Sequence, residues 1–170
     1  RDLIGFVSQK PVLFSGTVRD NITYGNESAS DEEVLKALEI AQAKDFVLGL
    51  PEGLEAVVAQ GGTNFSGGQK QRLSIARALV RRPAIYIFDD SFSALDFKTD
   101  AQLRAALRRE TQDATKLIVA QRVSTVLDAD KIIVLDQGRV VGIGRHKELL
   151  KTSPVYREIV ASQLSEEELA

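Results

Sequence analysis

The 170-residue sequence contains no cysteine, no methionine and no tryptophan, and only one histidine. Without cysteine the chain cannot form disulfides or thiolate metal sites, which fits a reducing compartment such as the cytoplasm. No apolar run approaches the roughly 18 residues of a membrane-spanning helix, and we do not expect the first residues to act as a signal peptide. If the protein works at a membrane, we expect another segment to make that contact.

The chain also lacks an excess of charge of either sign. Lys and Arg total 22 and Asp and Glu total 24, so the formal net charge is -2. Proteins that bind nucleic acid concentrate positive charge on one face, and this balance therefore argues against a nucleic-acid partner. With 44% hydrophobic residues, the chain is long enough for one globular unit that buries roughly 70% of its unfolded surface.

Residues 64–96 contain two devices for handling phosphate. Ser66–Gln69 (Ser-Gly-Gly-Gln) stands directly before a helical pattern in which Leu73, Ala76 and Leu79 share one face with Val80. The first amides of a helix and its positive dipole end attract anions, and two glycines let an anion approach the backbone closely. The segment therefore suits a phosphate, although an ordinary helix cap and turn has the same composition.

The second device lies at the other end of this stretch. Pro83 is expected to stop the helix, and Ala84–Phe88 is typical of a buried strand that delivers Asp89 and Asp90 at its carboxyl end. Open α/β sheets bind ligands at that edge. A strand with a solvated acidic end is the alternative. The complete order of cap, helix, apolar strand, paired acids and Ser-Ala-Leu-Asp at 93–96 is far more specific than any one part.

This order resembles the nucleotide-binding domain of ATP-binding cassette (ABC) transporters, over nearly the whole chain. FSGGQ at 65–69 is similar to the family's signature motif, IYIFDD at 85–90 to its Walker B strand, and SALD at 93–96 to its D-loop. We call Ser66–Gln69 the signature segment. The resemblance implies an α/β fold: part of a RecA-like P-loop NTPase core, with a mainly parallel sheet flanked by helices, and an inserted α-helical signature subdomain.

The resemblance assigns residues 1–170 to the C-terminal part of one such domain. Residues 12–82 would form the Q-loop and helical subdomain, 1–11 and 83–164 the catalytic core portion, and 165–170 a solvated tail. The local pattern adds several elements. These are a helix capped by Ser30 and Glu33, another near Asp45–Leu48, one with Leu103 and Leu107 inward, a buried strand at 117–120, a short helix capped by Ser124, a hairpin around Gln137-Gly138 and a terminal helix at 156–164.

ATP and Mg²⁺ are the ligands that the resemblance implies. Gln9 would reach the magnesium ion or the attacking water, Asp89 would bind the metal, and Asp90 and Gln121 would be catalytic together with Gln9. The ATP-binding residues would be Ser66, Gly67, Gly68, Gln69 and Asp96. Because two such domains pair head to tail in the family, the signature segment would serve the partner's ATP, whereas this domain's own ATP would be served by Asp89, Asp90, Gln9 and Gln121.

The implied partners are a second nucleotide-binding domain and a transmembrane domain in the same or another chain. The loop after Gln9, through Phe14 and the Ile-Thr-Tyr at 22–24, would face the coupling helices of the transmembrane domain. Gln60 is uncharged where the family's exporters usually have an acid before the signature, so a contact across the domain pair there is left open.

Two positions depart from the family's pattern in the site itself. Asp90 stands where hydrolytic members have glutamate, one methylene longer, and a misplacement of about 1 Å can cost on the order of a hundredfold in rate. Gln121 stands where the family has histidine; glutamine can donate a hydrogen bond but cannot take up a proton. The single histidine, His146, is expected on the surface and outside this role.

We therefore interpret the chain as an ATPase subunit that couples ATP binding and hydrolysis to export, at the cytoplasmic face of the cell membrane. Its own site would be impaired, as in the degenerate half of a heterodimeric exporter. Two alternatives stay open: a regulatory module that holds ATP without turnover, and a slow homodimeric transporter ATPase. A soluble ABC protein acting on nucleic acid lacks support from charge or a long coiled coil.

The sequence begins with Arg1 and contains no G-x-x-x-x-G-K-[ST] phosphate loop, so we expect it to be part of a longer chain. We predict that the isolated 170 residues have no measurable ATPase activity and bind ATP weakly, because the lysine-bearing loop supplies most of the phosphate contacts. Titration calorimetry with magnesium and ATP tests this. Micromolar affinity would contradict the prediction.

Overall fold

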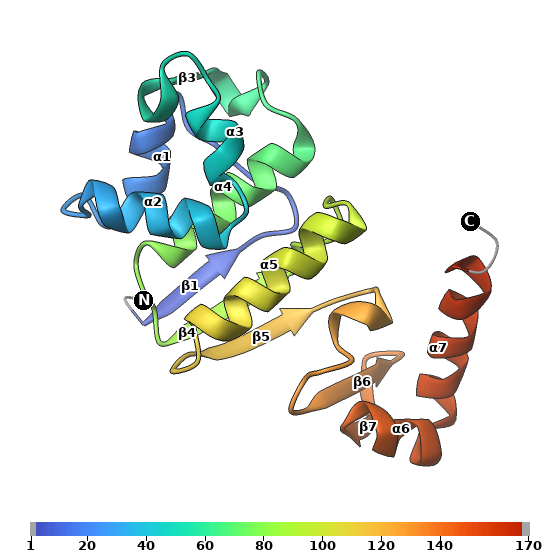
Figure 1. Ribbon diagram of the computed structural model, residues 1–170. Coiled ribbons are helices and arrows are strands. Elements are labelled where there is room, and N and C mark those ends of the chain that lie inside the picture. The colour runs from blue at the N-terminus through green and yellow to red at the C-terminus, as the bar shows by residue number, and fades with distance from the viewer. Residues whose placement is uncertain (1–2, 168–170) are drawn as a thin grey trace. The chain divides into compact units, whose positions relative to one another are not determined.

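The structure is a computed structural model that describes residues 3–167. The chain divides into two compact units, the first extending to Val119 and the second beginning at Ala120. Figure 1 shows the helices and strands of both units.

A parallel three-stranded sheet forms the base of the first unit. Its order is β1 (Ile4–Val7), β4 (Ile85–Asp89), β5 (Thr115–Val119), so the middle strand is the one that carries the paired acids. The register places Phe88 beside Val7 on one side and beside Ile118 on the other. The parallel sheet with flanking helices confirms the predicted fold class.

The strands of this sheet alternate between a covered and an exposed face. Val7, Tyr86 and Phe88 are buried, whereas Phe6 is 58% exposed and Leu117 is 52% exposed. The prediction of buried strands at 84–88 and 117–120 is therefore wrong for one face of the sheet within the described residues. An apolar run suits either arrangement, because the elements that pack on the second face decide whether it is covered.

Five α-helices and several short elements make up the rest of the described part of the first unit. The helices are α1 (Val18–Thr23), α2 (Asp31–Ile40), α3 (Lys44–Leu48), α4 (Gly67–Leu79) and α5 (Phe97–Glu110). Strands β2 (Gly16–Thr17) and β3 (Val57–Val58) pair antiparallel, and short 3-10 helices occupy Gly53–Glu55 and Gln60–Gly62.

Local sequence explains where these helices begin. Ser30 and Glu33 form the predicted capping box at the start of α2, in which each side chain bonds the other residue's backbone N–H. The α3 helix begins one residue before the predicted stretch. The α4 helix ends at Leu79, and Arg82 then adopts a left-handed backbone conformation (φ 47°) before Pro83.

The core of the first unit is one hydrophobic cluster to which helices α1 to α5 and the covered face of the sheet all contribute. The four residues predicted to share one face of α4, Leu73, Ala76, Leu79 and Val80, are all buried. They belong to the same hydrophobic cluster as Phe88 and as Leu103 and Leu107 of α5. The inward face predicted for α5 is thus confirmed.

The second unit contains a hairpin and two helices. Strands β6 (Ile132–Asp136) and β7 (Arg139–Gly144) pair antiparallel, followed by α6 (His146–Thr152) and α7 (Pro154–Glu167), with a 3-10 helix at Val123–Thr125. Gln137 and Gly138 both have positive φ (46° and 75°), as a tight two-residue hairpin turn requires.

Two boundaries in the second unit differ from the sequence prediction. The residue before the 3-10 helix is Arg122, so Ser124 lies inside that turn and is not its cap. The terminal helix starts at Pro154 and continues through 165–167, which were expected to belong to the tail; residues 168–170 lie outside the described part of the chain.

We predict that Leu73→Ala destabilises the protein by about 2–5 kcal/mol, because removal of the fully buried side chain leaves a cavity in the core around α4. Leu48→Ala is the matched control: Leu48 is 52% exposed, and we expect a change within about 0.5 kcal/mol. Urea unfolding followed by circular dichroism measures both. Equal losses for the two variants would contradict this assignment of the core.

Candidate functional site

The signature segment forms the capped start of α4. The Gln69 N–H donates to Ser66 Oγ at 3.2 Å, and the Ser66 N–H donates to Gln69 Oε1 at 2.9 Å. Since the Ser66 oxygen acts as the acceptor, its hydroxyl hydrogen can still be donated to a ligand. The amides of Gly67 and Gly68 lie in the first turn, where N–H groups have no acceptor within the helix.

The two glycines of this segment have different surroundings. A Cβ atom on Gly68 would lie 3.3 Å from the Ala94 carbonyl oxygen and 3.8 Å from Leu95, whereas a Cβ atom on Gly67 would meet nothing within 4 Å. Gly68 thus lets the signature segment pack closely on residues 93–96. The open space at Gly67 lies where a ligand from outside the chain could reach the helix amides.

Asp96 caps the start of α5. Its Oδ1 accepts the Thr99 N–H at 2.9 Å, and its Oδ2 accepts the Thr99 hydroxyl at 2.7 Å. These hydrogen bonds, the backbone one first, favour the charged form and hold the pKa of Asp96 below its usual value. Both oxygens of this exposed carboxylate therefore have partners within the chain.

The paired acids lie at the carboxyl end of β4, at the edge of the sheet. Asp89 is the last residue of the strand, and Asp90 has a left-handed backbone (φ 46°) with its N–H donated to the Val119 carbonyl oxygen at 2.9 Å. The Gln9 side chain donates from Nε2 to Asp90 Oδ2 at 3.2 Å. The fold thus brings together two of the residues expected to act on ATP.

These residues fit a magnesium ion that is shared with a nucleotide. Mg²⁺ prefers oxygen ligands and usually takes one or two carboxylates together with substrate phosphates and water. Asp89 offers a carboxylate, and Gln9 keeps its carbonyl oxygen available because its nitrogen makes the bond to Asp90. Within residues 3–167, no group of three or more His, Cys, Asp or Glu side chains could hold a metal alone.

Two residues that the sequence analysis did not single out anchor the end of β1. Ser91 Oγ donates to the Val7 carbonyl oxygen at 2.8 Å, and Gln71 Nε2 donates to the Ser8 carbonyl oxygen at 3.4 Å. Both partners lie just before Gln9. A serine and a glutamine without a motif of their own give no indication of these contacts in the sequence.

Gln121 lies at the start of the second unit and is exposed. Its carbonyl oxygen accepts a hydrogen bond from Gln163 Nε2 at 2.5 Å, and Gln163 Oε1 accepts the Val123 N–H at 2.7 Å. The side chain of Gln163, on α7, therefore fixes the backbone on both sides of Arg122. This is a second contact that no motif predicted.

His146 is partly buried, so the surface position expected for it holds only in part. Its Nδ1 lies 2.8 Å from the Tyr156 hydroxyl oxygen, and the two rings meet edge to face with centroids 5.7 Å apart. Tyr156 belongs to the small core of the second unit. The histidine thus joins the starts of α6 and α7.

The loop after Gln9 presents an aromatic pair. Phe14 and Tyr24 are 44% and 61% exposed, with ring centroids 4.9 Å apart. Arg77 of α4 lies beneath them, with its Cζ 5.1 Å from the Phe14 centroid and its Nη2 donating to the Val12 carbonyl oxygen at 2.6 Å. Ile22 is fully buried, so the expectation that it faces outward is wrong.

Comparison with protein families finds a match between residues 1–93 and the model described as ABC transporter. None of the helices within residues 3–167 has both the length and the apolar character needed to cross a bilayer.

Individual relatives match almost the whole chain. An ABC transporter ATP-binding protein of Mycobacterium bovis is 53% identical over 163 residues, 94% of this chain and 28% of that protein. The human mitochondrial potassium channel ATP-binding subunit is 46% identical, over 95% of this chain and 22% of its own length. The chain therefore spans less than a third of the length of these relatives.

The fold is also similar to a solved structure. A bacterial Atm1-family ABC exporter with ATP bound matches with a TM-score of 0.91 and 41% sequence identity, over 96% of this chain and 28% of that one. At this identity the likeness extends to the sequence as well as the fold.

We predict a pH-dependent contribution of Asp96 to stability. Because its pKa is lowered in the folded chain, the charged cap stabilises the protein above the ordinary carboxyl pKa, and this contribution is lost as the pH falls through the lowered value. Asp96→Asn keeps a good cap residue that does not titrate. The wild type should have the higher urea midpoint near pH 7, and the difference should shrink below about pH 4. A constant difference between pH 7 and pH 3 would contradict this assignment.

Proposed function

Because the chain belongs to the ABC transporter family, we propose that it helps to power export by coupling ATP binding and hydrolysis to movement of a substrate across a membrane. The similarity to an exporter with ATP bound supports export as the direction. The family also supports a place at the cytoplasmic face of the membrane, beside a transmembrane domain and a second nucleotide-binding domain.

The signature segment is proposed to serve the ATP of the partner domain. The observation that carries this proposal is the exposed start of α4, where the cap leaves the Ser66 hydroxyl hydrogen and the amides of Gly67 and Gly68 available as donors. Such donors stabilise negative charge that builds up on a phosphate during transfer. Gln69 and Asp96 act mainly through this chain, since their side chains cap α4 and α5.

The chain's own site is proposed to be slow. Asp90 would orient or deprotonate the attacking water, but its carboxylate is one methylene shorter than the glutamate of hydrolytic members. Gln9 holds one oxygen of that carboxylate at 3.2 Å. Gln121 would donate to the phosphate without taking up a proton. Bound Mg²⁺, held by Asp89 and Gln9, would neutralise charge on the phosphates.

An intact signature segment beside an impaired site is the arrangement expected in one half of a heterodimer. We therefore propose that a partner with glutamate and histidine at the two corresponding positions hydrolyses ATP, and that this chain completes the partner's site.

The surface around Phe14 and Tyr24 is proposed to contact the transmembrane domain. Two exposed aromatic rings at 4.9 Å give a large apolar area, and the Arg77 guanidinium beneath Phe14 stiffens it. Arg77 belongs to the same helix as the signature segment. Movement of α4 on nucleotide binding would therefore be transmitted to this surface.

A regulatory module that holds ATP without turnover is the second candidate. The bond from Gln9 to Asp90 favours it, because an amide donated to the carboxylate competes with the proton of a water molecule for the same oxygen. Under this proposal, ATP would stay bound and unhydrolysed in the chain's own site.

Steady-state ATP turnover of the assembled full-length transporter tests the proposed division of labour. We predict that Ser66→Arg lowers turnover by about a hundredfold, because it blocks the donors offered to the partner's ATP. Asp90→Ala should change turnover only a few-fold, since the partner's carboxylate does the chemistry. The assignment is reversed if Ser66→Arg has no effect and Asp90→Ala abolishes turnover.

Asp90→Glu tests the chain's own site. ATP turnover is measured, and the thermal unfolding midpoint of the variant controls for a change in stability. A gain of tenfold or more in ATP turnover would support a slow catalytic site over the regulatory module. Unhydrolysed ATP trapped at one site per dimer, with no gain, would support the regulatory module.

A further inference from the structure

The guanidinium of Arg72 lies at the junction between the signature segment and the helices before it. Its Nη1 donates to the Gln42 carbonyl oxygen at 2.6 Å, and its Nε donates to the Gly68 carbonyl oxygen at 3.3 Å. Its Cζ also lies 4.7 Å from the centre of the Phe46 ring. One side chain of α4 therefore contacts the turn after α2, helix α3 and a glycine of the signature segment.

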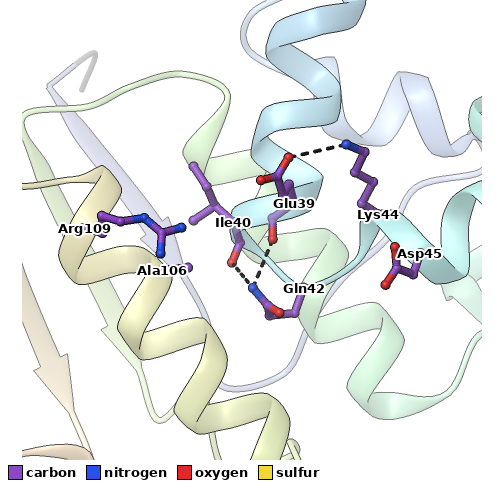
Figure 2. A pocket seen from close by; sticks show the side chains of 7 residues that line it. All are labelled: Glu39, Ile40, Gln42, Lys44, Asp45, Ala106 and Arg109. Carbon is purple, nitrogen blue, oxygen red and sulfur yellow. Dashed lines mark hydrogen bonds and ion pairs between the residues drawn. The ribbon is translucent and has the colours of Figure 1, made fainter.

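The turn that receives Arg72 is itself closely held. Gln42 has a left-handed backbone (φ 59°), and its Nε2 donates to the carbonyl oxygens of Glu39 at 3.1 Å and Ile40 at 3.4 Å, which caps the end of α2. This amide lines a pocket of about 430 Å³. Figure 2 shows Ala106 and Arg109 of α5 on the far side of that pocket. The Gln42 carbonyl thus gives Arg72 a fixed point outside α4.

The Phe46 ring under Arg72 lies next to Phe65, the residue directly before the signature segment. Phe46 and Phe65 lie with centroids 6.4 Å apart, and Phe65 is only 8% exposed. Arg72 therefore holds the signature segment from two sides, directly through Gly68 and through the aromatic pair that precedes Ser66.

The electrostatic surroundings of Arg72 support an anchoring role. Burial lowers the pKa of Arg72, and the charge of Asp96 acts in the opposite direction. The guanidinium stays charged in any case. Placing a half-buried charge here has a desolvation cost, which the bonds to two carbonyl oxygens and the aromatic contact offset.

We propose that Arg72 is a positioning residue for ATP hydrolysis: by linking the Gln42 and Gly68 carbonyl oxygens across the Phe46 ring, it sets the angle at which the signature segment meets a phosphate. This inference rests on the proposed function of the signature segment. Arg72 acts through Gly68 and does not itself touch the nucleotide. A lysine at this position keeps the charge but has no planar fork to join both oxygens.

The proposed role affects the rate more than the binding of ATP. The signature segment completes a site whose other side is supplied by the partner domain, and a displacement of about 1 Å at such a contact can cost up to a hundredfold in rate. Loss of Arg72 should therefore lower kcat while KM for ATP changes by no more than about threefold.

Kinetics of the assembled full-length transporter test this inference with four variants: Ser66→Ala, Arg72→Met, Arg72→Lys and the double variant with Ser66→Ala and Arg72→Met. We expect Arg72→Met to lower kcat about tenfold to a hundredfold and Arg72→Lys to lower it by a smaller factor. If both residues act on one contact, the double variant should be hardly slower than the slower single variant. Losses that multiply would overturn the inference.

Arg77→Met is the matched control for general damage to α4. Arg77 lies on the same helix and also combines a carbonyl bond of 2.6 Å with an aromatic contact, but on the Phe14 side. In a double variant, the fold-change in kcat caused by Arg77→Met should multiply with the fold-change caused by Ser66→Ala, whatever its size. If it shows the same non-additivity as Arg72→Met, a general effect on the helix explains both and the inference is wrong.

The Ser66→Ala and Arg72→Lys variants separate the role of the signature segment from that of Arg72. Unchanged turnover in Ser66→Ala would contradict the proposed function of the signature segment itself. A clear loss of turnover in Ser66→Ala together with an unchanged kcat in Arg72→Lys would contradict the role of Arg72 alone. Arg72→Lys decides this question if Arg72→Met does not assemble.

Discussion

The reciprocal cap between Ser66 and Gln69 is the interaction on which the first unit depends. It fixes where α4 begins, and α4 in turn packs against α1, α2 and β1. Because the two side chains satisfy one another's backbone amides, the serine keeps a hydrogen to donate and the glycine amides point out of the helix end. The same two bonds thus give the helix its start and leave it open toward an anion.

Features set by neighbours in the sequence could be predicted from it. The box at Ser30 and Glu33 and the turn at Gln137 and Gly138 depend on side chains within three residues, so their chemistry is visible in the chain. Ser124 shows the limit of this reasoning, because several polar residues near a short turn can each act as its cap. The exposed faces of β4 and β5 show a second limit, because the elements that cover a strand lie elsewhere in the protein.

The sequence indicated the types of residue in the site but not how they pair. Gln9 and Asp90 are 81 positions apart, and Arg72 and Gln42 are 30 apart. No periodicity encodes such contacts, which arise only when β1 and β4 lie side by side and α4 packs across α2. The contact between His146 and Tyr156 was not predicted for the same reason, because Tyr156 lies on the next helix.

The left-handed backbone of Asp90 limits which residues can replace it. Aspartate and asparagine adopt this conformation readily, whereas for other residues with a Cβ atom it costs roughly 1–2 kcal/mol. Aspartate at this position therefore relieves conformational strain, independently of how well its carboxylate orients the attacking water. A change to the longer acid would therefore extend the reach of the carboxylate at a cost in folding stability.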